Sequence, residues 1–276
     1  MTATLSWPDG KRIAVVFNIC LEAWSEGKAS PINPMGNPLP PQALDLMAIS
    51  WAAYGANRGI RRLLAGLARH GARASVAVNG IIADTAPDTV RAVAEAGHEI
   101  AGHSWAMDVI PGLMTEDQER ANIERCTEAL AKAAGAPVTG WLSPRATPST
   151  ATAALLAAAG YAWHGDTLSG DLPYLESFGE RDIVAIPFGT DVNDMPSMKY
   201  GAQPGQMVDS FVQNLEAARA TAETTIVDVT THAHIYGRPR GAYFHDKIAE
   251  IAAASSDVWI ATRGEIAQHF RRTRTP

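Results

Sequence analysis

Cysteine is scarce in this chain, because Cys20 and Cys126 are the only two among its 276 residues. Two cysteines cannot build the disulfide framework that holds many small secreted domains together. The chain also lacks an apolar run of about 18 residues, the length that a transmembrane helix needs, and its N-terminal segment MTATLSWPDGKR has no apolar signal core. These absences predict a soluble, cytoplasmic protein that does not act on a membrane.

An excess of basic charge is absent as well. The formal net charge is -6 at pH 7, which argues against nucleic acid or an anionic membrane surface as the main partner. Hydrophobic residues make up 46% of the chain, enough for a substantial core. No internal repeat or shift in composition marks a boundary, so residues 1–276 are expected to form one domain, a length common among α/β barrels.

Short β-rich runs alternate along the chain with longer runs rich in Ala and Leu, which is typical of parallel βα units. The predicted strands are Arg12–Phe17, Arg73–Val78, Glu99–Ala101, Gly140–Leu142, Tyr161–His164, Ile183–Phe188, Thr225–Thr230 and Val258–Ala261. The predicted helices are Gly59–His70, Pro87–Ala96, Glu116–Ala134, Ser149–Ala159, Pro204–Glu223 and Phe244–Ser255. This order predicts an α/β fold in which about seven or eight strands form a barrel.

One segment is too long for a simple connection. Glu26–Ala53 is rich in Pro, Gly and Asn, and loops of this length in compact domains usually serve a function. We expect it to be a long loop that acts as a lid or as an arm at an interface between subunits.

The segment Gly97–Asp108 is the most informative stretch of the sequence. It predicts a short strand followed by a loop that presents His103. A second histidine four residues later would complete a metal-binding pair on one helical face, but Met107 occupies that position. The pattern predicts a hydrolase site that lacks one metal ligand.

Polar residues follow most of the predicted strands, where the catalytic loops of such barrels lie. They are Cys20 and Glu22; His103; Ser143, Pro144 and Arg145; His164 and Asp166; Asp191, Asn193 and Asp194; and His232 and His234. Six strands that deliver such groups to one rim favour an active site there over coincidence.

Several stretches resemble the polysaccharide deacetylase superfamily, which has the NodB-like distorted (β/α) barrel. They are Phe17–Glu22, Tyr54–Gly59, Gly97–His103, Gly140–Arg145, His232 with Gly237-Arg238-Pro239, and Asp257–Ala267. The likeness is greatest to the branch with peptidoglycan deacetylase-like proteins, metal-independent allantoinase analogues and cyclic imide hydrolases. It implies an α/β, NodB-like barrel of about seven strands, and oligomers, since relatives in this branch associate.

The resemblance assigns roles by position. The family's catalytic-base aspartate falls on Cys20, its metal-binding aspartate on Glu22, and its two metal histidines on His103 and Met107. A thioether is a poor ligand for Zn²⁺, so loss of the metal is expected; Glu22 and His103 would be its ligands if one is present.

The expected catalytic residues are Glu22, His103, Arg145 and His232. The resemblance makes Arg145 the substrate-facing arginine and His232 the general acid. Either Glu22 or His103 would deprotonate a water molecule, Arg145 would stabilise the oxyanion, and His232 would protonate the departing nitrogen. The residues expected to contact substrate are Cys20, Tyr54, Arg58, Trp105, Asp108, Ser143, Pro144, Asp166 and Asn193.

Other interpretations of these residues stay open. Tyr54 and Arg58 could be ordinary packing at the start of a helix, and Cys20 could be a small buried hydrophobe. A covalent role for Cys20 is disfavoured because the sequence shows no neighbouring base. A His-x-His metal pair formed by His232 and His234 is conceivable.

The expected function is hydrolysis of a non-peptide C–N bond in a small cyclic amide, imide or ureide, without a metal cofactor. An activated ring has a good leaving group, which makes chemistry without a metal feasible. The alternatives are a Zn²⁺-dependent N-deacetylase of an amino sugar or related acetamide, and a ligand-binding pseudoenzyme. The expected partners are a small-molecule substrate and further copies of the chain.

Overall fold

A single sheet of nine strands organises the part of the chain that the structure describes, residues 5–34, 39–40 and 42–274 of a computed structural model. The strands are β1 Ile13–Leu21, β2 Ala74–Val78, β3 Glu99–Gly102, β4 Gly140–Trp141, β5 Trp163–His164, β6 Tyr174–Phe178, β7 Arg181–Ala185, β8 Thr225–His232 and β9 Val258–Ala261. Their order is β6-β7-β5-β4-β3-β2-β1-β8, and β9 also pairs with β1. All these pairs are parallel except β6 with β7, so the predicted α/β class is confirmed.

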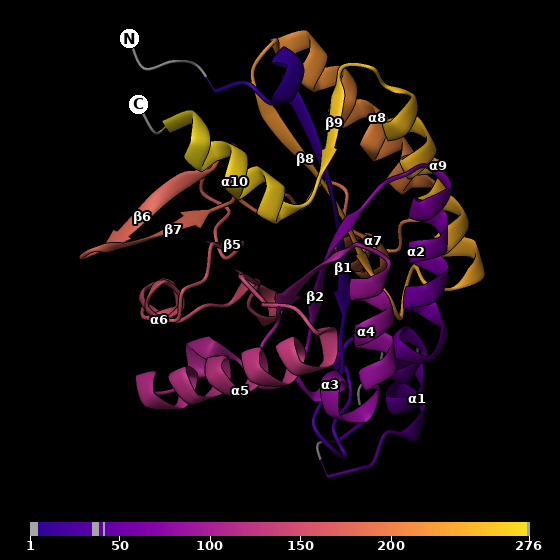
Figure 1. Ribbon diagram of the computed structural model, residues 1–276. Helices are drawn as coiled ribbons and strands as arrows, with labels where there is room; N and C mark the ends of the chain where they lie inside the picture. Colours follow the sequence, from indigo (N-terminus) through magenta and orange to yellow (C-terminus); the bar gives the residue numbers. More distant parts are fainter. Residues whose placement is uncertain (1–4, 35–38, 41, 275–276) are drawn as a thin grey trace.

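Ten α-helices in the described residues connect and cover the strands (Figure 1). They are α1 Leu46–Tyr54, α2 Ile60–Arg69, α3 Ile81–Thr85, α4 Pro87–Glu95, α5 Glu116–Ala134, α6 Thr152–Ala158, α7 Asp194–Lys199, α8 Pro204–Thr221, α9 Pro239–Ala254 and α10 Arg263–Arg274. The helices α2, α8 and α9 pack side by side on one flank of the sheet, and α4 and α5 pack beside β3. None of the helices in the described part of the chain is both long and apolar enough to cross a lipid bilayer.

Two sequence predictions about the fold need correction. The sheet has nine strands instead of the eight predicted segments, because Tyr174–Phe178 adds a strand that pairs antiparallel with β7. The long segment predicted over Glu26–Ala53 ends earlier, since α1 begins at Leu46 and the side chain of Asp45 caps it by accepting a hydrogen bond from Ala48 N at 2.9 Å. Residues 35–38 and 41 of that segment lie outside the described residues.

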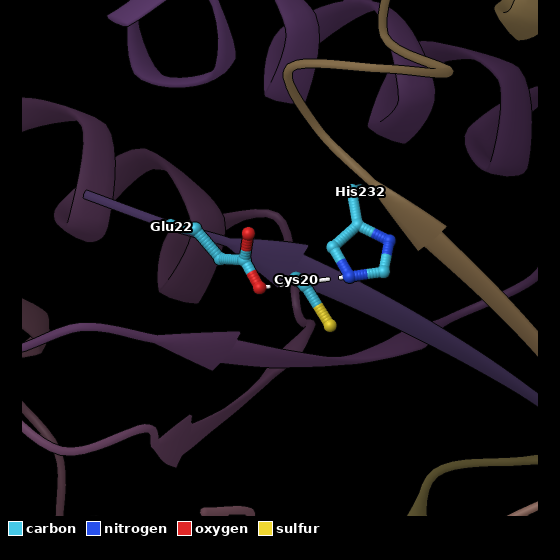
Figure 2. Close-up of side chains that lie close together, drawn as sticks. All are labelled: Cys20, Glu22 and His232. Atoms are coloured by element: carbon cyan, nitrogen blue, oxygen red, sulfur yellow. Dashed lines mark ion pairs between the residues drawn. The ribbon is translucent and has the colours of Figure 1, made fainter. Parts of the chain in front are cut away.

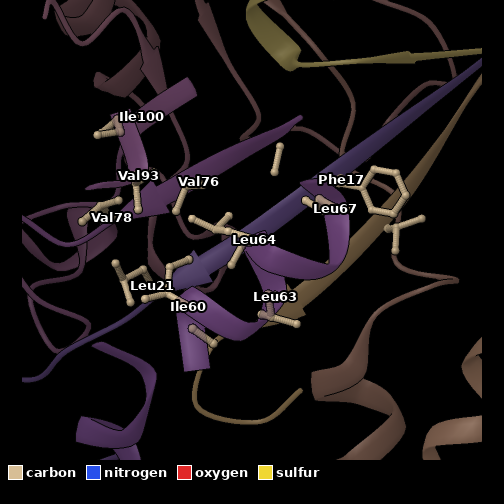
Figure 3. Close-up of a cluster of buried hydrophobic side chains, with 14 of the residues drawn as sticks. Phe17, Leu21, Ile60, Leu63, Leu64, Leu67, Val76, Val78, Val93 and Ile100 are labelled. Atoms are coloured by element: carbon tan, nitrogen blue, oxygen red, sulfur yellow. The ribbon is translucent and has the colours of Figure 1, made fainter. Parts of the chain in front are cut away.

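Strand β1 shows how alternation sorts side chains between the two faces of the sheet. Ile13, Val15, Phe17, Ile19 and Leu21 point to one face and join the larger hydrophobic cluster. In α2, Ile60, Leu63, Leu64 and Leu67 recur at helical spacing and pack onto this cluster (Figure 3). The alternate β1 residues Ala14, Val16, Asn18 and Cys20 must then face the other side of the sheet.

The connection between α1 and α2 packs closely against the loop after β8. It is a π-helical turn, Gly55–Gly59, and a Cβ atom added to Gly59 would lie 1.9 Å from the carbonyl oxygen of Ala233. Ala233 directly follows His232, so this contact sets the position of the polypeptide after β8. The glycines of the Tyr54–Gly59 motif are needed for this close approach of two backbones.

We expect Gly59→Ala to destabilise the protein by about 1–3 kcal/mol or more, as overpacking does, because the backbone of Ala233 would have to move. Gly66→Ala is the matched control in α2. Its added Cβ would lie 3.6 Å from the nearest atom, Asp246 Cβ, and removing a helical glycine should stabilise by about 0.5–1 kcal/mol. Urea denaturation of both variants tests this pair, and equal stability of the two would contradict it.

Candidate active site

A cavity of about 1010 Å³ opens at the carboxyl ends of the parallel strands. The residues that line it come from β1 and β8 and from the segments that follow β1, β3, β4, β5 and β7. Polar and charged residues of the lining are Cys20, Glu22, Lys28, Ser30, His103, Asp108, Ser143, Arg145, Thr190, Asn193, Lys199, Thr230 and His232. Apolar and aromatic residues, among them Trp24, Leu142, Leu168, Phe188 and Tyr200, form much of the rest.

Glu22 lies at the centre of the polar part of this cavity. It directly follows β1 and is only 4% exposed. Its Oε1 is 3.6 Å from His103 Nε2 and 3.5 Å from His232 Nε2. Figure 2 shows the Glu22 carboxylate and the His232 ring turned toward each other, with the Cys20 thiol beside them. One buried carboxylate therefore faces two imidazole rings from different strands.

Each of these two rings is held through its other nitrogen. His103 Nδ1 donates a hydrogen bond to the carbonyl oxygen of Leu142. His232 Nδ1 is 2.6 Å from Asp194 Oδ1, and the His232 backbone N–H donates to Asp194 Oδ2 at 2.8 Å. Both Nε2 atoms are thereby directed toward Glu22. Such outer contacts fix the orientation and the tautomer of a histidine.

The charges in the site follow from this arrangement. Burial raises the pKa of Glu22, but the nearby His232, His103 and His234 outweigh it and lower the pKa to about 2, so the side chain is a carboxylate. Burial lowers the pKa of His232, yet Cys20, Glu22 and Asp194 together raise it well above its ordinary value. His232 is therefore a proton donor at neutral pH. Burial also raises the pKa of the Cys20 thiol.

His234 is buried behind the cavity. It is 0% exposed and packs edge-on against Trp51 and Trp24, with ring centroids 4.5 and 5.8 Å apart. Burial lowers its pKa to about 4, so the ring is neutral. Its Nδ1 is 3.9 Å from Glu22 Oε2. Because His234 does not line the cavity, the arrangement does not favour the His-x-His metal pair with His232.

Arg145 lies on the rim of the cavity on a constrained turn. Its side chain is exposed, and both Arg145 and Ala146 have positive φ, 60° and 49°. Asp166 supports this turn from behind: Ser143 donates to it from its backbone N–H and from its hydroxyl, both at 2.6 Å. Non-glycine residues with positive φ cost free energy and are often found at functional sites.

Comparison with known proteins places the chain. Residues 52–164 match the family model "Polysaccharide deacetylase". A crystal structure from Mycobacterium smegmatis, which bears the provisional name of a polysaccharide deacetylase, is 29% identical to this chain. The TM-score is 0.85, and the match covers 99% of this chain and 95% of that one. Residues 52–164 therefore form a polysaccharide deacetylase domain. Deacetylases and allantoinases of this family hydrolyse non-peptide C–N bonds, the class of reaction expected from the sequence.

Two further proteins that match this chain have names that state different substrates. A peptidoglycan deacetylase from Helicobacter pylori is 22% identical over 255 residues, which cover 80% of this chain and 87% of that protein. The structure of PuuE allantoinase matches with a TM-score of 0.85 at 24% identity, over 97% of this chain and 93% of that one, a likeness of fold. The superfamily therefore leaves the substrate of this chain open.

The metal position that the superfamily resemblance implies does not fit a metal ion here. That position comprises Glu22, His103 and Met107, and Met107 lies on the cavity wall at 8% exposure. Its thioether is a poor ligand for Zn²⁺, so only two good donors remain. Glu22 and His103 also contact each other directly. An ion at this position is therefore not part of the proposed chemistry.

The residues predicted from the sequence fall into two groups, according to whether they line the cavity. Those that line the cavity are Glu22, His103, Arg145, His232, Cys20, Asp108, Ser143 and Asn193. Those predicted to contact substrate that do not line it are Tyr54, Arg58, Trp105, Pro144 and Asp166. Asp108 lies on the wall but is engaged, since it accepts a hydrogen bond from Ser25 N at 2.8 Å and pairs with Lys28 at 2.9 Å.

The five residues outside the cavity have structural roles or lie at the surface. Tyr54 packs under the guanidinium of Arg238 at 4.2 Å, and Trp105 packs under that of Arg125 at 3.4 Å. Arg58 is exposed and Pro144 is buried. Asp166 acts on the site only through the turn that carries Arg145.

Asp194 is the main functional residue that sequence reasoning did not select. It follows the predicted strand Ile183–Phe188, as Asn193 does, but nothing in the spacing of Asp194 and His232 shows that they meet. A parallel bridge between Asn193 and Thr230 aligns the two segments. The tertiary structure thus pairs the Asp194 carboxylate with His232, which lies 38 residues further along the chain.

We expect Glu22→Gln to lower the pKa of His232, because the Glu22 carboxylate is one of the charges that raise it. NMR titration of the His232 ring protons measures the change. Asp108→Asn is the matched control, since it removes a carboxylate from the same cavity that is already paired with Lys28. An unchanged His232 pKa in Glu22→Gln would show that this contact does not set the charge of the site.

Proposed function

We propose that this protein hydrolyses a non-peptide C–N bond in a small cyclic amide, imide or ureide, without an ion at the superfamily's metal position. The observation that carries the proposal is the buried Glu22 carboxylate between the two oriented histidines, His103 and His232. Hydrolysis of an amide needs an activated water, a stabilised oxyanion and a protonated leaving nitrogen. The cavity offers a separate group for each of these three tasks.

Water activation is assigned to Glu22 and His103 together. A carboxylate with a pKa of about 2 is a poor proton acceptor near neutral pH, but it accepts a hydrogen bond well and orients a water molecule. His103 Nε2 is buried and has no hydrogen-bond partner within the described residues. Because its Nδ1 carries the hydrogen that is donated to Leu142, Nε2 is free to accept the proton from that water.

His232 protonates the departing nitrogen. Its raised pKa keeps the proton on the ring at neutral pH, and Asp194 holds that ring toward the cavity. Arg145 stabilises the oxyanion from the rim, a contribution that for one donor is typically about 2.7–4 kcal/mol. Together these residues would open a ring whose nitrogen and carbonyl carbon both lie inside the cavity.

A small activated ring suits this cavity better than an unactivated acetamide. The absence of a complete metal set removes the usual Lewis acid, so the substrate itself must supply a good leaving group. The allantoinase among the structural neighbours agrees with this choice, although its identity to this chain carries the fold alone.

The second candidate is metal-dependent N-deacetylation of an amino sugar or related acetamide. The name of the Helicobacter pylori relative favours it. The donor set at the superfamily's metal position argues against it, because Met107 replaces a ligand there. A pseudoenzyme that binds the ligand without turnover is the third outcome of the following test.

We expect the purified protein to open cyclic imides or ureides, such as succinimide, hydantoin, dihydrouracil or allantoin, and to release little acetate from chitooligosaccharides. Chromatography of the products measures both. His103→Ala and His232→Ala should each lower kcat by at least ~10²-fold, the usual contribution of a general acid or base. His269→Ala is the control, since this half-buried histidine does not line the cavity; it bonds the Ser6 carbonyl at 2.7 Å and packs beside Trp7 and Trp259. Acetate release as the dominant activity would overturn the proposal, and binding without either product would identify a pseudoenzyme.

We expect ring opening to survive prolonged dialysis against a chelator, and not to rise when divalent ions are added back. Elemental analysis of the same sample reports whether metal was present at the start. A protein that carries about one metal per chain and loses activity when the metal is removed would transfer the assignment to the metal-dependent deacetylase.

A further inference from the structure

Three metal-ligating atoms of different kinds converge at the base of the cavity. The Cys20 Sγ, a Glu22 carboxylate oxygen and a His232 imidazole nitrogen all lie within 4.8 Å of one another (Figure 2). All three side chains are buried, at 3%, 4% and 8% exposure. Thiolate, imidazole and carboxylate together form a donor set that Zn²⁺ accepts readily.

Unpartnered atoms beside this cluster point to a missing ligand. Glu22 Oε2 and His103 Nε2 are buried, and within the described residues neither has a hydrogen-bond partner. Buried polar atoms are nearly always paired, so the free Oε2 of Glu22, an oxygen of a proposed ligand, is open to a cation or to water.

The spacing of the donors also suits a small ion. Bond lengths of about 2.0–2.3 Å to a tetrahedral Zn²⁺ place neighbouring ligand atoms about 3.3–3.8 Å apart. The Glu22 Oε1 to His232 Nε2 distance is 3.5 Å, and the Cys20 Sγ lies within 4.8 Å of the ligand atoms of both residues. Asp194 holds the far nitrogen of His232, as carboxylates do behind the histidines of zinc sites.

We propose that Cys20, Glu22 and His232 form an inhibitory site for a thiophilic divalent cation such as Zn²⁺ or Cd²⁺. This set differs from the superfamily's metal position, because it takes the acid histidine and a thiol in place of His103 and Met107. Inhibition rests on the proposed function. The ion would occupy the Glu22 oxygen that orients water and the His232 nitrogen that donates the proton, while the Cys20 thiol and the His232 imidazolium each release one proton to solvent.

Direct metal titration of the apo protein tests the site without a substrate. Co²⁺ bound through Cys20 should give a thiolate-to-cobalt charge-transfer band in the near ultraviolet, and calorimetry with Zn²⁺ should give one site per chain. Cys20→Ser should abolish the band and weaken Zn²⁺ binding by at least ~10-fold, and Asp194→Asn should weaken it by about 10–100-fold. Cys126→Ala is the matched control, because Cys126 is buried, does not line the cavity and donates to the Ser104 carbonyl at 3.3 Å.

The inhibition is then measured with the best ring substrate from the panel. Zn²⁺ should inhibit at the concentrations that saturate the site, and a chelator should restore the rate. A cobalt spectrum without a thiolate band, or one lost equally in Cys126→Ala, would overturn the site; circular dichroism excludes unfolding of the variants. Activation by Zn²⁺ would overturn the inhibitory role. If no ring substrate is hydrolysed, the proposed function fails, while the titration still decides the metal site.

Discussion

The rest of the structure depends on how the backbone of β1 is paired. All nine residues of this strand are buried, so each of its N–H and C=O groups needs a partner inside the protein. β8 pairs along almost its whole length on one side, while the other side is divided between β9 near Ile13–Val16 and β2 near Phe17–Leu21. Three strands distant in sequence are thereby held in register with β1.

That register also explains the contents of the inner face of the sheet. Along β1 and β8, alternate residues point inward, and below the cavity they include Asn18 and Asp228. Arg263 fills the space between them: it donates to Asn18 at 2.9 Å and pairs with Asp228 at 2.7 Å, and all three are buried. Removing one partner of such a pair typically costs about 3–5 kcal/mol. Further along the same strands the inward residues are Cys20 and His232, whose Cα atoms are partners in the register.

A charged cluster of this kind is stable only because its charges compensate. The Glu22 carboxylate is buried, but His103 and His232 lie on either side of it, and Asp194 supports His232 from behind. The same compensation places a carboxylate with a lowered pKa beside a histidine with a raised pKa within one cavity.

Much of the fold and part of the site could be predicted from the sequence alone. Local periodicity located the helix Glu116–Ala134 and the strand Val258–Ala261 at the bounds that the structure has. Selecting residues at or just past strand ends gave Glu22, His103, Arg145 and His232, which the structure brings together around one cavity. These features are local, because alternation and strand ends depend on neighbours along the chain. The hairpin partner Tyr174–Phe178 and the Asp194–His232 pair could not be predicted, since both require segments to meet through the sheet. Likewise, only the tertiary structure decided that Tyr54 and Arg58 lie outside the cavity lining. The physical reason is that the close contact of Gly59 with Ala233, and not the polar side chains of that motif, fixes the position of this helical turn beside the segment after β8.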